Sequence, residues 1–224
     1  MRIALLGAES TGKSTLALAL ERHWQDRHMP VARIDEHLRE WCEREGRTPQ
    51  PHEQMAIALE QVRRVDAAEA PLRVIADTTA LMTAVYSEML FGDTTLYPMA
   101  LAHQRSYQVT LLTGLDLPWV PDGLQRDGPQ VPEPVDRLLR ERLSEAGIAY
   151  RVVYGSGEDR LHNALLAIES AAAISLPGDA QALSARREGQ TRPWRCGKCS
   201  DPEGEHRLFT GGFGGAYSDL IGRR

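Results

Sequence analysis

The sequence predicts an α/β fold in which a doubly wound parallel sheet of about five strands lies between two layers of helices. Short apolar runs alternate along the first 175 residues with stretches whose apolar positions recur at helical spacing. The first run, residues 2–6, is apolar on both faces, as expected for a central strand covered on both sides. The alternation stops after residue 175, which predicts a short irregular C-terminal tail.

A glycine-rich loop follows the first predicted strand and precedes the first predicted helix. Residues 7–14 read Gly-Ala-Glu-Ser-Thr-Gly-Lys-Ser, which is the pattern of a phosphate-binding P-loop. Backbone N–H groups of such a loop hold nucleotide phosphates, Lys13 bridges the outer two, and Ser14 ligates Mg²⁺. The residues expected to bind the nucleotide are Gly7, Glu9, Ser10, Thr11, Gly12, Lys13, Ser14 and Thr15.

The remaining elements follow from hydrophobic spacing and from turn residues. Further strands are expected at 31–34, 72–76, 109–112 and 149–154. Helices are expected at 13–27, 37–45, 53–70, 80–91, 135–147 and from 156 onward. A further helical stretch follows the helix at 80–91 and ends at 105. The long helix carries Met55, Leu59, Val62 and Asp66 along it. We therefore expect a P-loop domain over 1–175, a linker over 176–193 and a tail over 194–224.

Composition excludes several classes of protein. The 224 residues carry a net charge of −5 and are 42% hydrophobic, so no basic surface suggests nucleic acid as a partner. No apolar run approaches 18 residues and the start reads as a strand rather than a signal peptide, so we expect no membrane segment and a cytoplasmic protein. Homo-oligomerisation is left open.

Acidic residues follow two of the predicted strands. Strand 31–34 ends in Asp35 and Glu36, and strand 72–76 ends in Asp77. Carboxylates at these strand ends can take a proton from an attacking hydroxyl or order the water around Mg²⁺. The alternatives are a helix N-terminus that favours acidic residues at 35 and 36, and an N-cap at Asp77.

Aromatic and cationic side chains supply candidates for binding a second substrate. Trp41 and Tyr86 could stack on a flat ring, or could belong to the core. Residues 115–134 form a long irregular loop with five prolines, the length of a functional lid. Arg126 in this loop could stabilise charge on a transferring phosphoryl group, or lie solvated on the surface.

The tail contains a set of metal-ligand residues that is short of a complete site. Cys196, Cys199 and His206 could supply three of the four ligands of a structural Zn²⁺ site. The alternative is a tail with free thiols. Three cysteines in all do not make a disulfide framework.

Four stretches in this order resemble the ribosylnicotinamide kinase domain of the bacterial NadR proteins. They are the loop at 7–15, Glu-His-Leu-Arg-Glu-Trp at 36–41, Ile-Ala-Asp-Thr at 75–78 and Pro-Trp-Val-Pro-Asp-Gly at 118–123. The last is the most specific, because the family has Pro-Trp-Val, any residue, then Asp-Gly after its fourth strand. The family's arginine after Asp-Gly falls one residue closer than Arg126 does here. The resemblance covers about three quarters of the chain.

The resemblance implies a P-loop kinase-like fold and ATP-dependent phosphorylation of nicotinamide riboside to nicotinamide mononucleotide. A kinase of another nucleoside or vitamin, and a regulatory P-loop ATPase that acts through a protein partner, stay open as alternatives. The catalytic candidates are Lys13, Glu36, Asp77 and Arg126. The candidates at a small hydroxyl acceptor are Asp35, Glu36, Arg39, Trp41, Tyr86, Trp119 and Asp122. Ser14 and Asp77 are the candidates for Mg²⁺.

Overall fold

The computed structural model describes residues 1–68, 73–120 and 128–174. Over these residues the chain forms one five-stranded sheet, in the order β2-β3-β1-β4-β5, with every neighbouring pair parallel. The doubly wound α/β fold predicted from the sequence is therefore confirmed. The strands are β1 (Arg2–Leu6), β2 (Val31–Ile34), β3 (Arg73–Asp77), β4 (Val109–Thr113) and β5 (Arg151–Val153).

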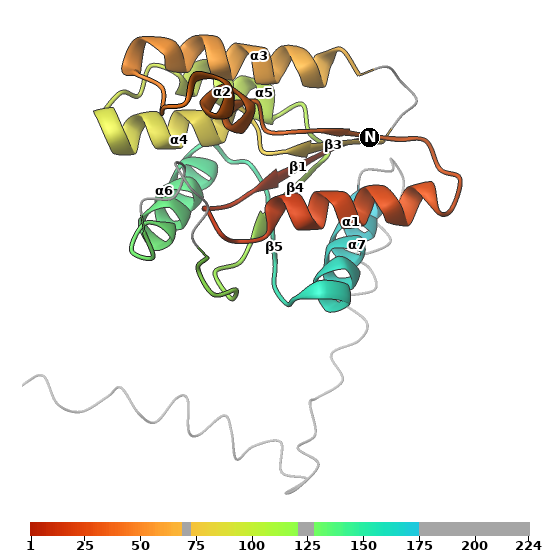
Figure 1. The fold of residues 1–224 in the computed structure, drawn as a ribbon. Coiled ribbons are helices and arrows are strands. Elements are labelled where there is room, and N and C mark those ends of the chain that lie inside the picture. The colour runs from red at the N-terminus through yellow and green to blue at the C-terminus, as the bar shows by residue number, and fades with distance from the viewer. Residues whose placement is uncertain (69–72, 121–127, 175–224) are drawn as a thin grey trace, which may run out of the picture. The chain divides into compact units, whose positions relative to one another are not determined.

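Helices cover both faces of this sheet and give the fold three layers. Figure 1 shows α1 and α7 on one side of the sheet and α3, α4 and α5 on the other. A single turn of 3-10 helix, η1 (Pro51–Glu53), leads into α3. The helices are α1 (Lys13–Gln25), α2 (His37–Glu45), α3 (Gln54–Asp66), α4 (Ala80–Phe91), α5 (Tyr97–Gln104), α6 (Pro132–Glu145) and α7 (Gly157–Ile174).

Side chains of β1 alternate between the two cores, as the pleat of a strand requires. Ile3 and Leu5 pack with α1 and α7, whereas Leu6 packs with α4, α5 and α6. All three side chains are completely buried. Burial on both faces explains why the first strand is a continuous apolar run.

Two helices differ from the sequence-based expectation. Helix α6 begins at Pro132, three residues earlier than expected, because proline is tolerated in the first turn, where its missing N–H has no helical partner. In α3 the buried face carries Gln54, Ile57, Ala58, Gln61 and Val65, and Leu59 is exposed. Two glutamines on the buried stripe conceal it from a search for apolar periodicity.

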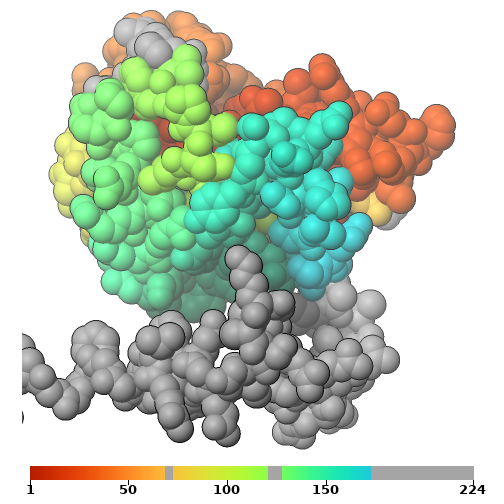
Figure 2. Space-filling view, turned by 90° about the horizontal axis from the view of Figure 1, so that it is seen from below, coloured from red at the N-terminus to blue at the C-terminus, as the bar shows by residue number. Residues whose placement is uncertain are grey.

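The order of the strands reverses at β1. This strand lies between β3 and β4, and its carboxyl end leads directly into the glycine-rich loop. In open α/β sheets such a switch point opens a crevice in which ligands bind. Figure 2 shows the segment after β4 (yellow-green) crossing this region between α6 (green) and α7 (cyan).

None of the described helices is long and apolar enough to cross a membrane. The linker and tail expected from the sequence lie outside the described residues, and with them Cys196, Cys199 and His206.

Candidate active site

The glycine-rich loop has a backbone that only glycine adopts without strain at its two ends. Gly7 has a φ of +144° and Gly12 a φ of +77°. A Cβ atom on Gly7 would also lie 2.1 Å from Oγ1 of Thr113, far inside any real contact. The spacing of the two glycines is therefore set by backbone shape and by the approach of β4.

Hydroxyl groups hold this loop on the ends of β1 and β4. Oγ1 of Thr113 donates its single proton to Oγ1 of Thr11 at 2.6 Å, and the Leu6 carbonyl lies 3.1 Å from the same oxygen as an alternative acceptor. Thr11 in turn donates to the Ala8 carbonyl at 2.7 Å, and Nζ of Lys13 donates to the same carbonyl at 2.7 Å. The loop is thus shaped before any phosphate binds, which lowers the ordering cost of binding.

Arg160, in the first turn of α7, also holds the phosphate loop in place. Its guanidinium donates to the Thr11 carbonyl, to the Gly155 carbonyl at 2.6 Å and to Oδ1 of Asp116 at 2.5 Å. Arg160 is 4% exposed, whereas Asp116 is exposed, so the bond to the Thr11 carbonyl is the one that is buried. One arginine therefore joins the P-loop, the start of α7 and the segment after β4.

The segment after β4 also contacts the P-loop directly. Nε1 of Trp119 donates to Oε1 of Glu9 at 3.1 Å. Oγ of Ser10 donates to the Val120 carbonyl at 3.0 Å and accepts from the Val120 N–H at 3.2 Å. The indole of Trp119 is thereby placed beside the phosphate loop. Asp122 and Arg126 fall outside the described residues.

Glu36 is a half-buried carboxylate at the N-terminus of α2, and it lines the cavity that adjoins the P-loop. Burial raises the pKa of Glu36, and the negative charge of Asp77 adds to this, while the positive charges of Lys13 and Arg39 oppose it. Nε of Arg39 lies 3.7 Å from Oε2 of Glu36. A carboxylate with a raised pKa next to a lysine of the phosphate loop is suited to accept a proton near neutral pH.

The end of β3 places Asp77 and Thr78 beside β1. Asp77 pairs in register with Leu5, and its Oδ1 is buried without a hydrogen-bond partner among the described residues. The N-cap of α4 is Thr79, whose hydroxyl accepts from the Leu81 N–H at 3.2 Å, so the N-cap alternative for Asp77 is wrong. Thr78 has a φ of +73°, a strained conformation for a β-branched residue that is characteristic of functional sites.

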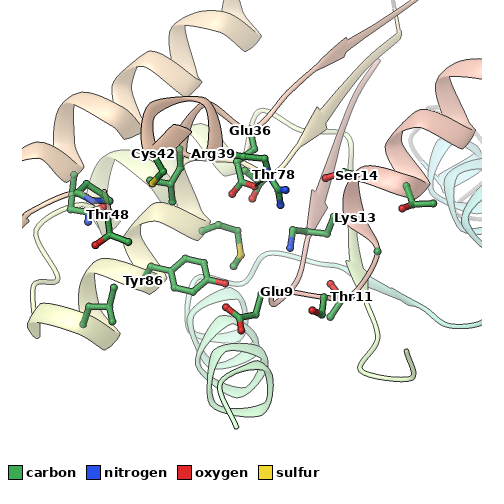
Figure 3. Close-up of a pocket in the computed structure, with 18 residues that line it drawn as sticks. Glu9, Thr11, Lys13, Ser14, Glu36, Arg39, Cys42, Thr48, Thr78 and Tyr86 are labelled. Carbon is green, nitrogen blue, oxygen red and sulfur yellow. Dashed lines mark ion pairs between the residues drawn. The ribbon is translucent and has the colours of Figure 1, made fainter. Parts of the chain in front are cut away.

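A cavity of about 320 Å³ runs from the P-loop to α2, α3 and α4, a volume within the range of small-molecule sites. Figure 3 shows Lys13 and Ser14 at one end, Thr48 and Cys42 at the other, and the Tyr86 hydroxyl directed between them. The lining residues are Glu9 to Thr15, Glu36, Leu38, Arg39, Cys42, Thr48, Pro49, Gln54, Thr78, Met82, Tyr86 and Leu90.

Some of the residues expected in the acceptor site lie elsewhere. Asp35 is exposed, forms an ion pair with Arg33 and does not line the cavity. Trp41 is 9% exposed and packs with Ile57, while the guanidinium of Arg47 lies 4.8 Å from its ring centre. Glu36, Arg39 and Tyr86 do line the cavity.

Three residues of this region were not anticipated from the sequence. Thr113 ends a uniformly buried strand, and Arg160 follows two acidic residues in a helix start, so neither carries a local signal. Gln54 carries none either, because its place on the buried stripe of α3 is known only from the packed structure.

Ser14 and Asp77 fit the requirements of a magnesium site. The Ser14 residue is exposed in the first turn of α1, and the buried Oδ1 of Asp77 lacks a hydrogen-bond partner in the described part of the chain. Hydroxyl and carboxylate oxygens are the ligands that Mg²⁺ takes in phosphoryl-transfer sites. Among the described residues no group of three or more His, Cys, Asp or Glu side chains forms a metal cluster.

The P-loop between β1 and α1 and the cavity that adjoins it are the features of a P-loop protein. The family model described as "AAA domain" matches residues 2–160, and the chain belongs to that family. A search of curated proteins gives no match.

Solved structures then show which P-loop fold it is. NadR in complex with NAD and AMP-PNP is 18% identical with a TM-score of 0.60, over 78% of this chain and 50% of that one. NadR in complex with NR gives the same identity and TM-score over 75% and 50%. Deoxyadenosine kinase from M. mycoides is 13% identical with a TM-score of 0.54, over 76% and 100%. The chain has the fold of a NadR-like P-loop kinase domain and spans about half the length of the NadR chains.

Proposed function

We propose that this protein is an ATP-dependent kinase of a small nucleoside-like hydroxyl compound, and that nicotinamide riboside is its acceptor. One observation carries the first part: the cavity of about 320 Å³ is continuous with the P-loop and contains Lys13, Glu36 and Arg39. A phosphate donor and a hydroxyl acceptor bound in one cavity would meet beside these charges. A nucleotide switch needs room for its nucleotide but none for an acceptor, so the extension of the cavity from the P-loop to α2, α3 and α4 favours the kinase.

The residues divide the work of phosphoryl transfer between them. Mg·ATP, held by the P-loop with Ser14 and Asp77 toward the metal, supplies the phosphoryl group. Lys13 and Arg39 stabilise the negative charge that develops during transfer. Glu36, or Asp77 beside it, accepts the proton of the acceptor hydroxyl. Most of the rate acceleration comes from positioning and electrostatics rather than from the base.

The choice of nicotinamide riboside rests on the four stretches shared with the NadR kinase domain and on NadR, in complex with NR, having a similar fold. The structure of deoxyadenosine kinase supports the wider class, kinases of nucleosides. Within this proposal Trp119 or Tyr86 would stack on the acceptor ring, since both lie beside the P-loop or its cavity. A regulatory ATPase is the competing function.

The test is release of ADP from Mg·ATP by the purified protein, with nicotinamide riboside, common nucleosides, thiamine or no acceptor. Acceleration by nicotinamide riboside alone supports the proposal in full. Acceleration by another nucleoside or by thiamine keeps the kinase and replaces its acceptor. Slow release at one rate with every addition contradicts the kinase and favours the regulatory ATPase.

A further inference from the structure

The first residue of α3, Gln54, carries a buried amide oxygen that has no hydrogen-bond partner in the described part of the chain. Gln54 is 2% exposed and lines the cavity. A buried carbonyl oxygen without a partner destabilises the folded protein. Because Gln54 lines the cavity, a turn of its amide toward the cavity would let a ligand supply the missing donor.

A second glutamine of the same helix shows what a structural amide does here. Gln61 lies two turns further along α3 and is 3% exposed. Its Oε1 accepts from the His37 N–H at 2.8 Å and its Nε2 donates to the Asp35 carbonyl at 3.4 Å. Gln61 thus joins α3 to α2. Oε1 of Gln54 makes no such contact with the described chain.

The surroundings of Gln54 suit a flat ring. The cavity that Gln54 lines is also lined by the apolar side chains of Leu38, Pro49, Met82 and Leu90. Figure 3 places Thr48 and Cys42 at the end away from Lys13 and Ser14, and Cys42 belongs to a buried cluster with Ile57 of α3. An acceptor with its hydroxyl toward the phosphate loop would therefore direct its ring toward α3. An apolar pocket with few polar groups is how proteins orient such rings.

We propose that Gln54 selects the acceptor by pairing with an N–H donor that stands beside an acceptor atom on the ring. A primary amide offers one oxygen acceptor and two N–H donors, so it forms a two-bond pair with such an edge. The carboxamide of a pyridine ring and the amino edge of a nucleobase both have this chemistry, whereas a carboxylate has no N–H for Oε1. This inference rests on the proposed kinase function.

The experiment compares the full chain with Gln54→Leu, Gln54→Met and the control Gln61→Leu. The KM and kcat of each protein are measured with nicotinamide riboside, nicotinic acid riboside, adenosine and cytidine. We expect both Gln54 variants to raise the KM of the carboxamide or amino substrate about 10- to 100-fold with a nearly unchanged kcat, because a contact made equally in ground and transition states is lost. The preference for nicotinamide riboside over nicotinic acid riboside should also disappear in these variants.

The stability of the same proteins separates recognition from structure. Gln54→Leu and Gln54→Met remove an unpaired buried oxygen, so their Tm should equal or exceed that of the wild type. Gln61→Leu breaks one bond to His37 in α2 and one to Asp35 before it, and should lower the Tm while the ratio of acceptor preferences stays the same. Unchanged KM and preference in both Gln54 variants would overturn the inference.

A binding measurement keeps this inference distinct from the kinase proposal. Binding of the same four compounds is measured by calorimetry in the presence of AMP-PNP, where no turnover occurs. If the wild type phosphorylates none of them, nicotinamide riboside and these nucleosides fail as acceptors; loss of binding in the Gln54 variants alone would still support the role of Gln54. Binding that is equal in all variants, or absent from the wild type, overturns it.

Discussion

Nη2 of Arg160 donates to Oδ1 of Asp116 at 2.5 Å, between residues 44 positions apart. The other carboxylate oxygen of Asp116 accepts from the Gly155 N–H at 2.6 Å. Arg160 also donates to the Thr11 carbonyl in the P-loop, 149 positions away. The phosphate loop is therefore fixed from the C-terminal part of the domain as well as by its own strand and helix.

Replacing Arg160 by alanine should destabilise the protein and weaken nucleotide binding. The change removes an ion pair with the exposed Asp116 and leaves two carbonyl groups without a charged donor, and we expect a loss of about 2 kcal/mol in the free energy of unfolding. The KM for ATP should rise more than that of the acceptor. Urea denaturation and initial rates measure both effects. The exposed Arg151 in β5 is the control, and equal stability of Arg160→Ala and Arg151→Ala would contradict the assignment.

The hydroxyl of Thr113 should matter more than its methyl group. Thr113→Val keeps the shape but removes the bond to Thr11 and its alternative to the Leu6 carbonyl, and should cost about 1–2 kcal/mol of unfolding free energy. Thr113→Ser keeps the hydroxyl and should lose less. Denaturation curves and the Kd of a fluorescent ATP analogue give the comparison. A valine variant that binds nucleotide as tightly as the serine variant would show that the hydroxyl does not shape the loop.

Lys13→Ala should abolish turnover and leave the fold intact. Nζ of Lys13 donates to the Ala8 carbonyl within its own loop, and its charge is needed when the phosphoryl group moves, so we expect a fall of at least about 10³-fold in kcat. Circular dichroism and ADP release are the measurements. Near-normal turnover in this variant would refute the assignment of the P-loop to catalysis.

Glu36→Gln should lower kcat by about 10²-fold if Glu36 is the general base. Because burial raises the pKa of Glu36, the acidic limb of kcat/KM in the wild type should lie above the ordinary range of a glutamate. That limb should vanish in the variant. If the limb persists unchanged, Asp77 is the better candidate for the base.

The raised pKa of Glu36 also predicts how the stability of the wild type and of Glu36→Gln depends on pH. A carboxyl whose pKa is higher in the folded than in the unfolded chain favours folding when protonated, and this contribution is lost as the pH rises through the raised pKa. The Tm of the wild type should therefore fall relative to that of Glu36→Gln as the pH rises from 4.5, the ordinary pKa of a glutamate. Thermal melts over a pH series measure it. A difference that grows instead as the pH falls would contradict the shift.

Much of the fold could be predicted because its signals are local. The glycine spacing of the P-loop, the apolar run of β1 and the aspartate that ends β3 are each read within a few residues. The five parallel strands followed from these signals and are confirmed. The roles of the site residues stay predictions, although Glu36, Arg39 and Tyr86 line one cavity with the P-loop.

The positions that the sequence could not predict are those of residues whose environment depends on distant segments. Trp41 and Tyr86 carry the same aromatic signal, yet Trp41 packs against Ile57 while Tyr86 lines the cavity. Asp35 and Glu36 are neighbours, yet one is exposed and the other is half-buried beside Lys13. Adjacent positions at the end of a strand point in different directions, and only the packing of α2 decides which one faces the site.

The sequence by itself determined that a phosphate-binding loop follows a buried central strand and that the sheet around it is parallel, because backbone conformation and hydrophobic spacing are properties of short stretches. The tertiary structure alone decided that Arg160 and Thr113 support the loop, that the cavity extends to α3, and that an unpaired amide at Gln54 lines it. Those features depend on contacts between residues far apart in the chain, where burial and hydrogen bonding are set by packing rather than by local pattern.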